Sequence, residues 1–211
     1  MSSILIFLKA PRLGTVKTRL ADAVGEKTAQ SIYRELVEGQ MARLSGRYSM
    51  CVQYAPQAAA AEMSAWLGAD VSYQAQCEGD LGARLSSAIH AHFQAGAARL
   101  MCIGGDCPEL AVQHIAAADS ALDQGADVVL GPTEDGGFYL LGLSAPHDGL
   151  FSSVRWSTET TRRDVLDNAS ELHLSVSQLE TLYDVDDWTG YQRAVEEGFL
   201  RARCSDLEAC P

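Results

Sequence analysis

Cationic side chains gather near the start of a chain that is otherwise strongly acidic. The 211 residues hold 16 Lys and Arg against 28 Asp and Glu, a formal net charge of −12. One segment nevertheless carries four cations, Lys9, Arg12, Lys17 and Arg19. Exposed Lys and Arg side chains bind phosphate oxygens through charge-assisted hydrogen bonds. The segment lacks the GxxxxGK[ST] phosphate loop, because Pro11 and Val16 stand where that motif needs glycine. It predicts an anion site, and a solvated basic loop is the alternative.

Carboxylates form two further groups. Gly104-Gly105-Asp106-Cys107-Pro108 follows an apolar run, and Asp184-Val185-Asp186-Asp187 places three acids in four residues. Such acids repel one another unless a positive charge lies among them, and Mg²⁺ or Mn²⁺ is held by one or two carboxylates together with water and phosphate. Asp187 alone is explained as a helix N-cap. We therefore predict that Asp106 shares a divalent cation with Asp184 or Asp186, and that Cys107 is a structural thiol.

A glycine-rich run carries the remaining acids of interest. Glu134 and Asp135 directly precede Gly136 and Gly137. They could bind a sugar hydroxyl, a metal-bound water or an acceptor, and a hairpin turn is the equally weighted alternative. The run Trp156-Ser157-Thr158-Glu159-Thr160 is better explained as the capped start of a helix.

The apolar pattern alternates between short strands and longer helices. It predicts strands at residues 4–8, 48–54, 71–76, 100–103, 127–130, 138–143 and 172–176, and helices at residues 26–44, 58–67, 81–93, 112–122, 157–169 and 188–198. Helical crossovers imply an α/β fold whose mainly parallel central sheet has helices on both faces. Ligands of such sheets bind beyond the carboxyl ends of the strands, where the acidic and basic groups stand. We expect one domain over residues 1–198 and a polar C-terminal tail over 199–211.

Composition excludes several classes of protein. No apolar run reaches the roughly 20 residues of a membrane helix, and residues 4–8 lack the flanks of a signal peptide. The acidic surface disfavours nucleic acid and anionic lipid as partners. The cysteines at 51, 77, 102, 107, 204 and 210 form no CxxC pair, so we expect reduced thiols and a cytoplasmic location. No GxSxG, GxGxxG or HExxH motif occurs.

Six blocks of sequence, in order from residue 4 to residue 188, resemble a known bacterial family. They are Lys9-Ala-Pro-x-x-Gly-x-x-Lys17-Thr-Arg-Leu-Ala21, Gly79-Asp-Leu-Gly-x-Arg84, Gly105-Asp-Cys-Pro108, Gly131-Pro-x-Glu-Asp-Gly-Gly137, Trp156-Ser-Thr-Glu-Thr160 and Asp184-Val-Asp186. The family is domain of unknown function 2064, a group of nucleotide-diphospho-sugar transferases with a GT-A-type fold. The first and last blocks are also similar to 2-phospholactate guanylyltransferases, which are nucleotidyltransferases.

The resemblance implies a set of site residues. Asp106, Asp135 and Lys17 would be catalytic, and Asp106, Asp184 and Asp186 would hold Mg²⁺ or Mn²⁺. The nucleotide would contact Lys9, Gly14, Lys17, Arg19, Asp80, Arg84, Gly136 and Gly137, although Asp80 could merely cap a helix.

The implied reaction is glycosyl transfer from a nucleotide-diphospho-sugar to a small acceptor that the sequence does not identify. Nucleotidyl transfer from a nucleoside triphosphate is the alternative, and the basic first loop is better explained by a triphosphate. A non-catalytic nucleotide-binding domain is the third interpretation.

Overall fold

The computed structural model describes residues 2–202, so Cys204, Cys210 and most of the 199–211 tail lie outside it. A central sheet of seven strands runs through the described part, in the order β3-β2-β1-β4-β6-β5-β7. The strands are β1 (Ser3–Lys9), β2 (Ser49–Ala55), β3 (Ser72–Ala75), β4 (Leu100–Ile103), β5 (Val128–Pro132), β6 (Phe138–Leu143) and β7 (Val176–Gln178). Four of the six strand pairings are parallel, and β6 runs antiparallel to both of its neighbours.

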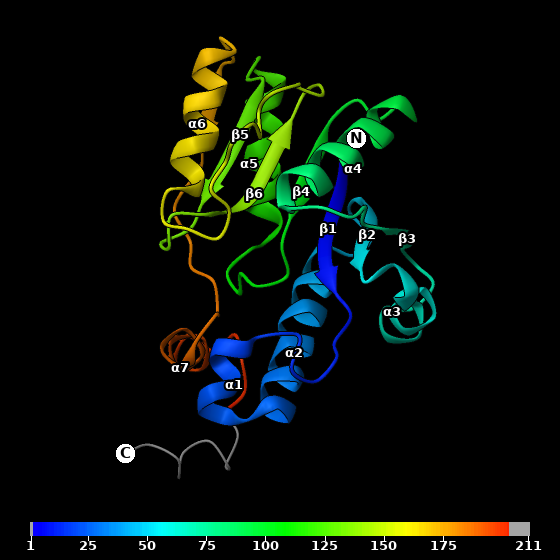
Figure 1. Cartoon of the computed structure of the whole chain (residues 1–211), viewed down its shortest axis with the longest axis vertical. Coiled ribbons are helices and arrows are strands. Elements are labelled where there is room, and N and C mark those ends of the chain that lie inside the picture. The colour runs from blue at the N-terminus through cyan, green and yellow to red at the C-terminus, as the bar shows by residue number, and fades with distance from the viewer. Residues whose placement is uncertain (1, 203–211) are drawn as a thin grey trace.

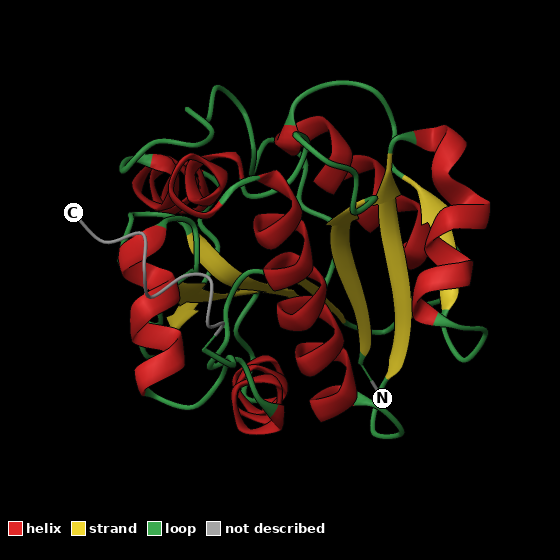
Figure 2. Cartoon of the chain, turned by 90° about the horizontal axis from the view of Figure 1, so that it is seen from below, coloured by secondary structure: helices red, strands yellow, loops and turns green. Residues whose placement is uncertain are grey.

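Helices cover both faces of this sheet (Figures 1 and 2). They are α1 (Thr18–Val24), α2 (Glu26–Leu44), α3 (Ala60–Leu67), α4 (Leu81–Gln94), α5 (Val112–Asp123), α6 (Thr161–Glu171) and α7 (Trp188–Glu196), with a 3₁₀ turn at Gln57–Ala59. One core cluster packs α2, α3 and α5 against the sheet, and a second packs α4 and α6 against the opposite face. The expected α/β class with a mainly parallel sheet is confirmed. None of the described helices has the length and apolar character needed to cross a membrane.

Strand β1 shows why a central strand of the sheet could be predicted from the sequence. Ile4, Leu5 and Ile6 are fully buried, because a central strand with helices on both sides must be apolar at successive positions. Its parallel neighbours β2 and β4 place their carboxyl ends beside its own. The segments after β1 and β4 therefore meet at one edge of the sheet.

Three predicted elements differ from the structure. Residues 18–24, for which no helix was predicted, form helix α1. Residues 157–160 precede helix α6 rather than opening it, because Ser157 takes a positive φ of 60°. The strand expected at residues 172–176 lies at Val176–Gln178, because the amide of Leu174 still donates to the carbonyl of Ala169 at the end of α6.

Candidate active site

A third hydrophobic cluster brings the two ends of the chain together beside α2. Leu20 of α1 and Val185, which precedes α7, are both fully buried in it. Figure 1 shows α1, α2 and α7 gathered below the sheet. Leu200, which belongs to the 199–211 segment, is also buried in this cluster. The packing fixes residues 17–20 next to residues 183–186, although they lie at opposite ends of the sequence.

Backbone hydrogen bonds join the acidic segments at the strand ends. The amide of Val185 donates to the carbonyl of Asp106 over 3.0 Å, and the amide of Glu134 donates to the carbonyl of Leu182 over 3.0 Å. Thr133 and Leu182 also form an isolated parallel bridge. The three segments that carry the predicted carboxylates are thus held side by side.

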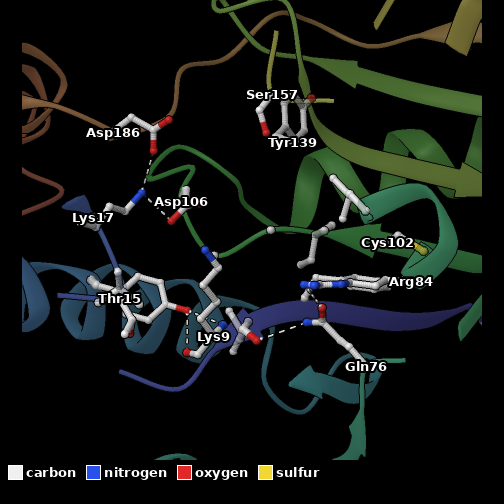
Figure 3. A pocket seen from close by; sticks show the side chains of 18 of the residues that line it. Lys9, Thr15, Lys17, Gln76, Arg84, Cys102, Asp106, Tyr139, Ser157 and Asp186 are labelled. Carbon is white, nitrogen blue, oxygen red and sulfur yellow. Dashed lines mark hydrogen bonds and ion pairs between the residues drawn. The ribbon is translucent and has the colours of Figure 1, made fainter. Parts of the chain in front are cut away.

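Lys17 stands at the point where two of these segments converge. Its ammonium lies 2.6 Å from Oδ1 of Asp106 and 3.1 Å from Oδ1 of Asp186, as Figure 3 shows. The Lys17 side chain is only 4% exposed, whereas the carboxylates are 42% and 46% exposed. Burial alone would lower the pKa of Lys17, but the charges of Asp106 and Asp186 outweigh it and raise the pKa above its ordinary value. Lys17 is therefore buried and charged, and the expectation that its side chain is exposed to solvent is wrong.

Gly105 allows Asp106 to reach this position. A Cβ atom at Gly105 would lie 2.7 Å from side-chain carbons of both Leu8 and Val37, a distance that real Cβ atoms do not adopt. The preceding carbonyl, that of Gly104, accepts a 2.6 Å hydrogen bond from Gln40 of α2. The turn after β4 is thereby pressed against the core with Asp106 at its tip.

A cavity of about 470 Å³ opens between the ends of β1 and β4 and the start of α4. Its lining includes six of the predicted site residues, Lys9, Lys17, Arg19, Arg84, Asp106 and Asp186. In Figure 3 the ammonium of Lys17 points between the two carboxylates, and Arg84 lies on the other side of the cavity. Four cationic side chains and two carboxylates thus face one hollow of a size typical of small-molecule sites.

Arg84 is held in place by two groups, and one of them, Gln76, was not among the predicted site residues. Its Nε donates to the carbonyl of Gly79 over 2.9 Å, and its Nη1 donates to Oε1 of Gln76 over 3.4 Å. Gln76 is itself buried and donates to the carbonyls of Leu8 and Gln53. The one available signal was a polar residue at the carboxyl end of the predicted strand 71–76, where ligand contacts are common in such sheets.

Tyr33 fixes the other side of the cavity and was also missed. Its hydroxyl donates to the carbonyl of Lys9 and accepts from the amide of Lys9, each over 3.0 Å. Burial, followed by the charge of Asp106, raises the pKa of this phenol far above its ordinary value. Tyr33 therefore stays protonated and ties the start of the basic segment to α2. The predicted helix at residues 26–44 contains Tyr33, but no motif marked it as a site residue.

Asp184 differs from its two acidic companions. Burial, and next the charge of Asp106, raise its pKa to about 8, although Lys17 lowers it. Asp135 and Asp186 add further repulsion. Burial and the neighbouring acids thus favour the protonated form of Asp184, and Asp184 does not line the cavity.

Five other predicted nucleotide-contacting or catalytic residues lie outside the cavity lining, namely Gly14, Asp80, Asp135, Gly136 and Gly137. Asp80 caps α4 by accepting from the amide of Ala83 over 2.8 Å. Asp135 accepts from the amide of Gly137 over 3.0 Å and from the hydroxyl of Thr133 over 2.5 Å. It thereby stabilises the turn between the antiparallel strands β5 and β6, in agreement with the hairpin interpretation.

The two carboxylates suit an ion such as Mg²⁺ that also binds water and phosphate, rather than a metal enclosed by protein ligands alone. Among residues 2–202, no group of three or more His, Cys, Asp and Glu side chains is arranged to hold a metal. Oδ1 of Asp106 is nevertheless buried, and its polar contact is the 2.6 Å ion pair with the Lys17 ammonium. Two carboxylates open to a cavity match Mg²⁺ or Mn²⁺, because these ions keep several waters and also bind substrate phosphates. Cys107, next to Asp106, is buried, and this burial raises the pKa of its thiol strongly, as expected for a structural residue.

Solved structures with this architecture place the chain among GT-A-like α/β proteins. A crystal structure from Desulfovibrio desulfuricans G20, of a protein provisionally named a nucleotide-diphospho-sugar transferase, is 29% identical with a TM-score of 0.87, covering 98% of this chain and 94% of that chain. CMP:2-keto-3-deoxy-manno-octonic acid synthetase in complex with CTP is 13% identical with a TM-score of 0.56, covering 94% and 99%. Rv0371c of Mycobacterium tuberculosis H37Rv in complex with manganese is 18% identical with a TM-score of 0.54, covering 93% and 99%. These last two similarities concern the fold alone.

The family itself follows from the sequence. Residues 40–158 match the family described as "Uncharacterized protein conserved in bacteria (DUF2064)". This span is more than half of the 211 residues, so the chain belongs to that family, as the six blocks indicated. A comparison with curated proteins finds no match.

Proposed function

We propose that this protein is a metal-dependent transferase that acts on a nucleotide-activated donor. One observation carries the proposal: Asp106 and Asp186 converge on the Lys17 ammonium at the wall of a cavity that three further cations line. Both carboxylates would hold a divalent ion, and a bound ion would neutralise charge on the phosphates of the donor. Lys9, Arg19 and Arg84 bind and orient the phosphates or the base, because their N–H groups are charged donors that match phosphate and carbonyl oxygens.

Between the two possible reactions, the charge of the site favours nucleotidyl transfer. A nucleoside triphosphate carries about four negative charges at neutral pH, whereas a nucleotide-diphospho-sugar carries about two. Four cationic side chains against two carboxylates, together with one divalent ion, balance the triphosphate. In this reaction a phosphate oxygen of the acceptor attacks the α-phosphorus, and the bond from that phosphorus to the oxygen of the departing pyrophosphate breaks. Lys17 and Arg19 would stabilise the charge on the leaving group.

Glycosyl transfer is the second candidate, and the similarity to the Desulfovibrio desulfuricans G20 protein favours it. In that reaction an acceptor hydroxyl oxygen loses its proton and bonds to the anomeric carbon, the bond from that carbon to the diphosphate oxygen breaks, and a nucleoside diphosphate departs. The same metal and the same cations would stabilise that leaving group. The two reactions therefore share the same site residues, and their products distinguish them.

Product analysis tests the proposal. Nucleoside triphosphates with phosphorylated sugars, and nucleotide-diphospho-sugars with sugar acceptors, are each incubated with protein and Mg²⁺ or Mn²⁺. Nucleotidyl transfer yields pyrophosphate, and glycosyl transfer yields a nucleoside diphosphate. Asp106→Asn should reduce either turnover at least about a hundredfold, the scale of losing one preorganised electrostatic contact, whereas Asp70→Asn, at an exposed position, should not. Tight nucleotide binding without either product across a broad panel would favour a non-catalytic binding domain.

A further inference from the structure

The ammonium group of Lys17 lies between two carboxylates, a position that a metal cation could also occupy. Its two ionic partners are carboxylate oxygens from different segments, Asp106 after β4 and Asp186 before α7. The lysine is the least exposed of the three side chains. A protein ammonium group therefore already balances the charge of the carboxylates that would hold the divalent ion.

The backbone conformation of Lys17 is energetically unfavourable. Lys17 has φ 49° and ψ 45°, the left-handed region, immediately before α1. For a residue with a Cβ atom, the left-handed conformation is unfavourable in free energy. It therefore persists only where the surrounding structure imposes it. The surroundings here are the packing of Leu20 against Val185 and the two ion pairs. The placement of the ammonium is thus built into the fold of the segment.

We propose that Lys17 is the internal counter-ion of the Asp106–Asp186 pair, that the divalent cation displaces it, and that its ammonium is then free to bind the donor phosphates. This inference rests on the proposed function, since it gives a second state to a residue assigned to phosphate binding. It makes metal and phosphate binding cooperative. Metal alone must break two ion pairs, whereas a phosphate that arrives with the metal offers the displaced ammonium a new anionic partner.

The size of the effect follows from the charges. An ammonium and a divalent ion within a few ångströms of each other repel, and a unit-charge pair at 4 Å in bulk water already changes an equilibrium by about fivefold. The Lys17 side chain is buried rather than solvated, so the effective dielectric is lower and the repulsion is larger. Removal of the Lys17 charge should therefore tighten the binding of metal alone by at least about tenfold.

The first test measures Mn²⁺ binding by electron paramagnetic resonance, without any nucleotide. We compare the wild type with Lys17→Met, with Lys17→Gln and with the control Lys27→Met, at an exposed position on α2. Methionine keeps the length of the side chain, and glutamine keeps a hydrogen-bond donor in case methionine impairs folding. Both Lys17 variants should bind Mn²⁺ at least about tenfold more tightly than the wild type, and the control should be unchanged. Unchanged Mn²⁺ affinity in both folded variants would overturn the proposal.

The second test uses the wild type and distinguishes displacement from simple repulsion. Reductive methylation with formaldehyde, read by mass spectrometry, reports whether the Lys17 amine is accessible. The amine should be protected in metal-free protein, because it is buried in two ion pairs, and it should become reactive when Mn²⁺ saturates the site. Continued protection with Mn²⁺ bound would show that the lysine is not displaced. Neither test needs turnover, so failure of the transferase assays would leave both results interpretable, and failure here would leave the transferase proposal standing.

Discussion

Lys17 and Asp186 lie 169 positions apart in the chain, and a hydrogen bond of 3.1 Å joins their side chains. The contact exists because α1 and α7 share a hydrophobic cluster in which Leu20 and Val185 are fully buried. The first and last parts of the chain thus close the site around Asp106. Burial of apolar side chains in one cluster positions three charged groups that could not be placed from their local sequence.

Arg84 should contribute to nucleotide affinity through its planar group and not through its charge alone. Gly79 and Gln76 hold two of its nitrogens, which leaves its remaining N–H groups for a ligand in the cavity. Arg84→Gln should weaken binding by about 1.5–3 kcal/mol, the range for hydrogen bonds to charged groups. Arg84→Lys should recover only part of the loss, because an ammonium cannot reproduce the fork of donors.

Isothermal titration calorimetry measures this effect with the nucleotide that stabilises the wild type most in a thermal-shift panel. Arg99→Gln is the control, because Arg99 pairs with Asp119 and Asp123 at the opposite end of β4. Equal affinities for the wild type and Arg84→Gln would remove Arg84 from the binding site.

Gly105→Ala should destabilise the protein, whereas Gly104→Ala should not. The added methyl group at Gly105 would lie 2.7 Å from carbons of Leu8 and Val37, whereas at Gly104 nothing lies within 4 Å. Overpacking of this kind typically costs about 1–3 kcal/mol. Urea denaturation of both variants measures the difference. Similar stabilities for the two would show that the turn before Asp106 is not pressed against the core.

Asp184 should make the protein less stable as pH rises. The pKa of Asp184 is raised from 3.8 to about 8, chiefly by burial and then by Asp106. The folded state therefore keeps a proton that the unfolded state releases above about pH 4. The contribution of Asp184 to stability is complete below that pH and is lost as pH rises toward 8, with a slope of up to about 1.4 kcal/mol per pH unit.

Urea unfolding at several pH values between 5 and 8, in buffer with a metal chelator, measures this dependence. Asp184→Asn, which cannot ionise, should show a flatter profile than the wild type. Parallel profiles for the two proteins would mean that Asp184 ionises normally in the folded state.

The sequence predicted the elements whose signals are local and strong. The boundaries of α2, β4 and β6 coincide with the predicted ranges 26–44, 100–103 and 138–143. Helix α1 was missed because it has seven residues and its one buried residue, Leu20, leaves no apolar period to detect. The antiparallel direction of β6 was only one of two expectations, since the glycine-rich run before it was compatible with both a hairpin and a binding loop, and the structure has the hairpin.

The sequence predicted the charged residues of the site but not the residues that hold them in position. Asp106 follows β4 at the edge of the sheet, and the packing of α1 with α7 brings Lys17 and Asp186 to it. Gln76 and Tyr33 donate hydrogen bonds to the carbonyls of Leu8 and Lys9, which are distant in sequence. No sequence pattern predicts such contacts. The burial of Lys17 was missed for the same reason, since it depends on α7 packing against α1.

The reverse reaction tests most directly the central claim that this site carries out nucleotidyl transfer to a sugar phosphate, because each nucleotide-diphospho-sugar supplies both the nucleotide and the acceptor. Nucleotide-diphospho-sugars are incubated with pyrophosphate, Mg²⁺ and protein, and the products are separated by ion-exchange chromatography. Attack of pyrophosphate on the phosphorus that bears the nucleoside should yield a nucleoside triphosphate and a sugar phosphate in equal amounts. Asp106→Asn should abolish both products. Formation of a nucleoside diphosphate from the same donors once sugar acceptors are added, with no triphosphate formed from pyrophosphate, would contradict the claim and establish glycosyl transfer instead.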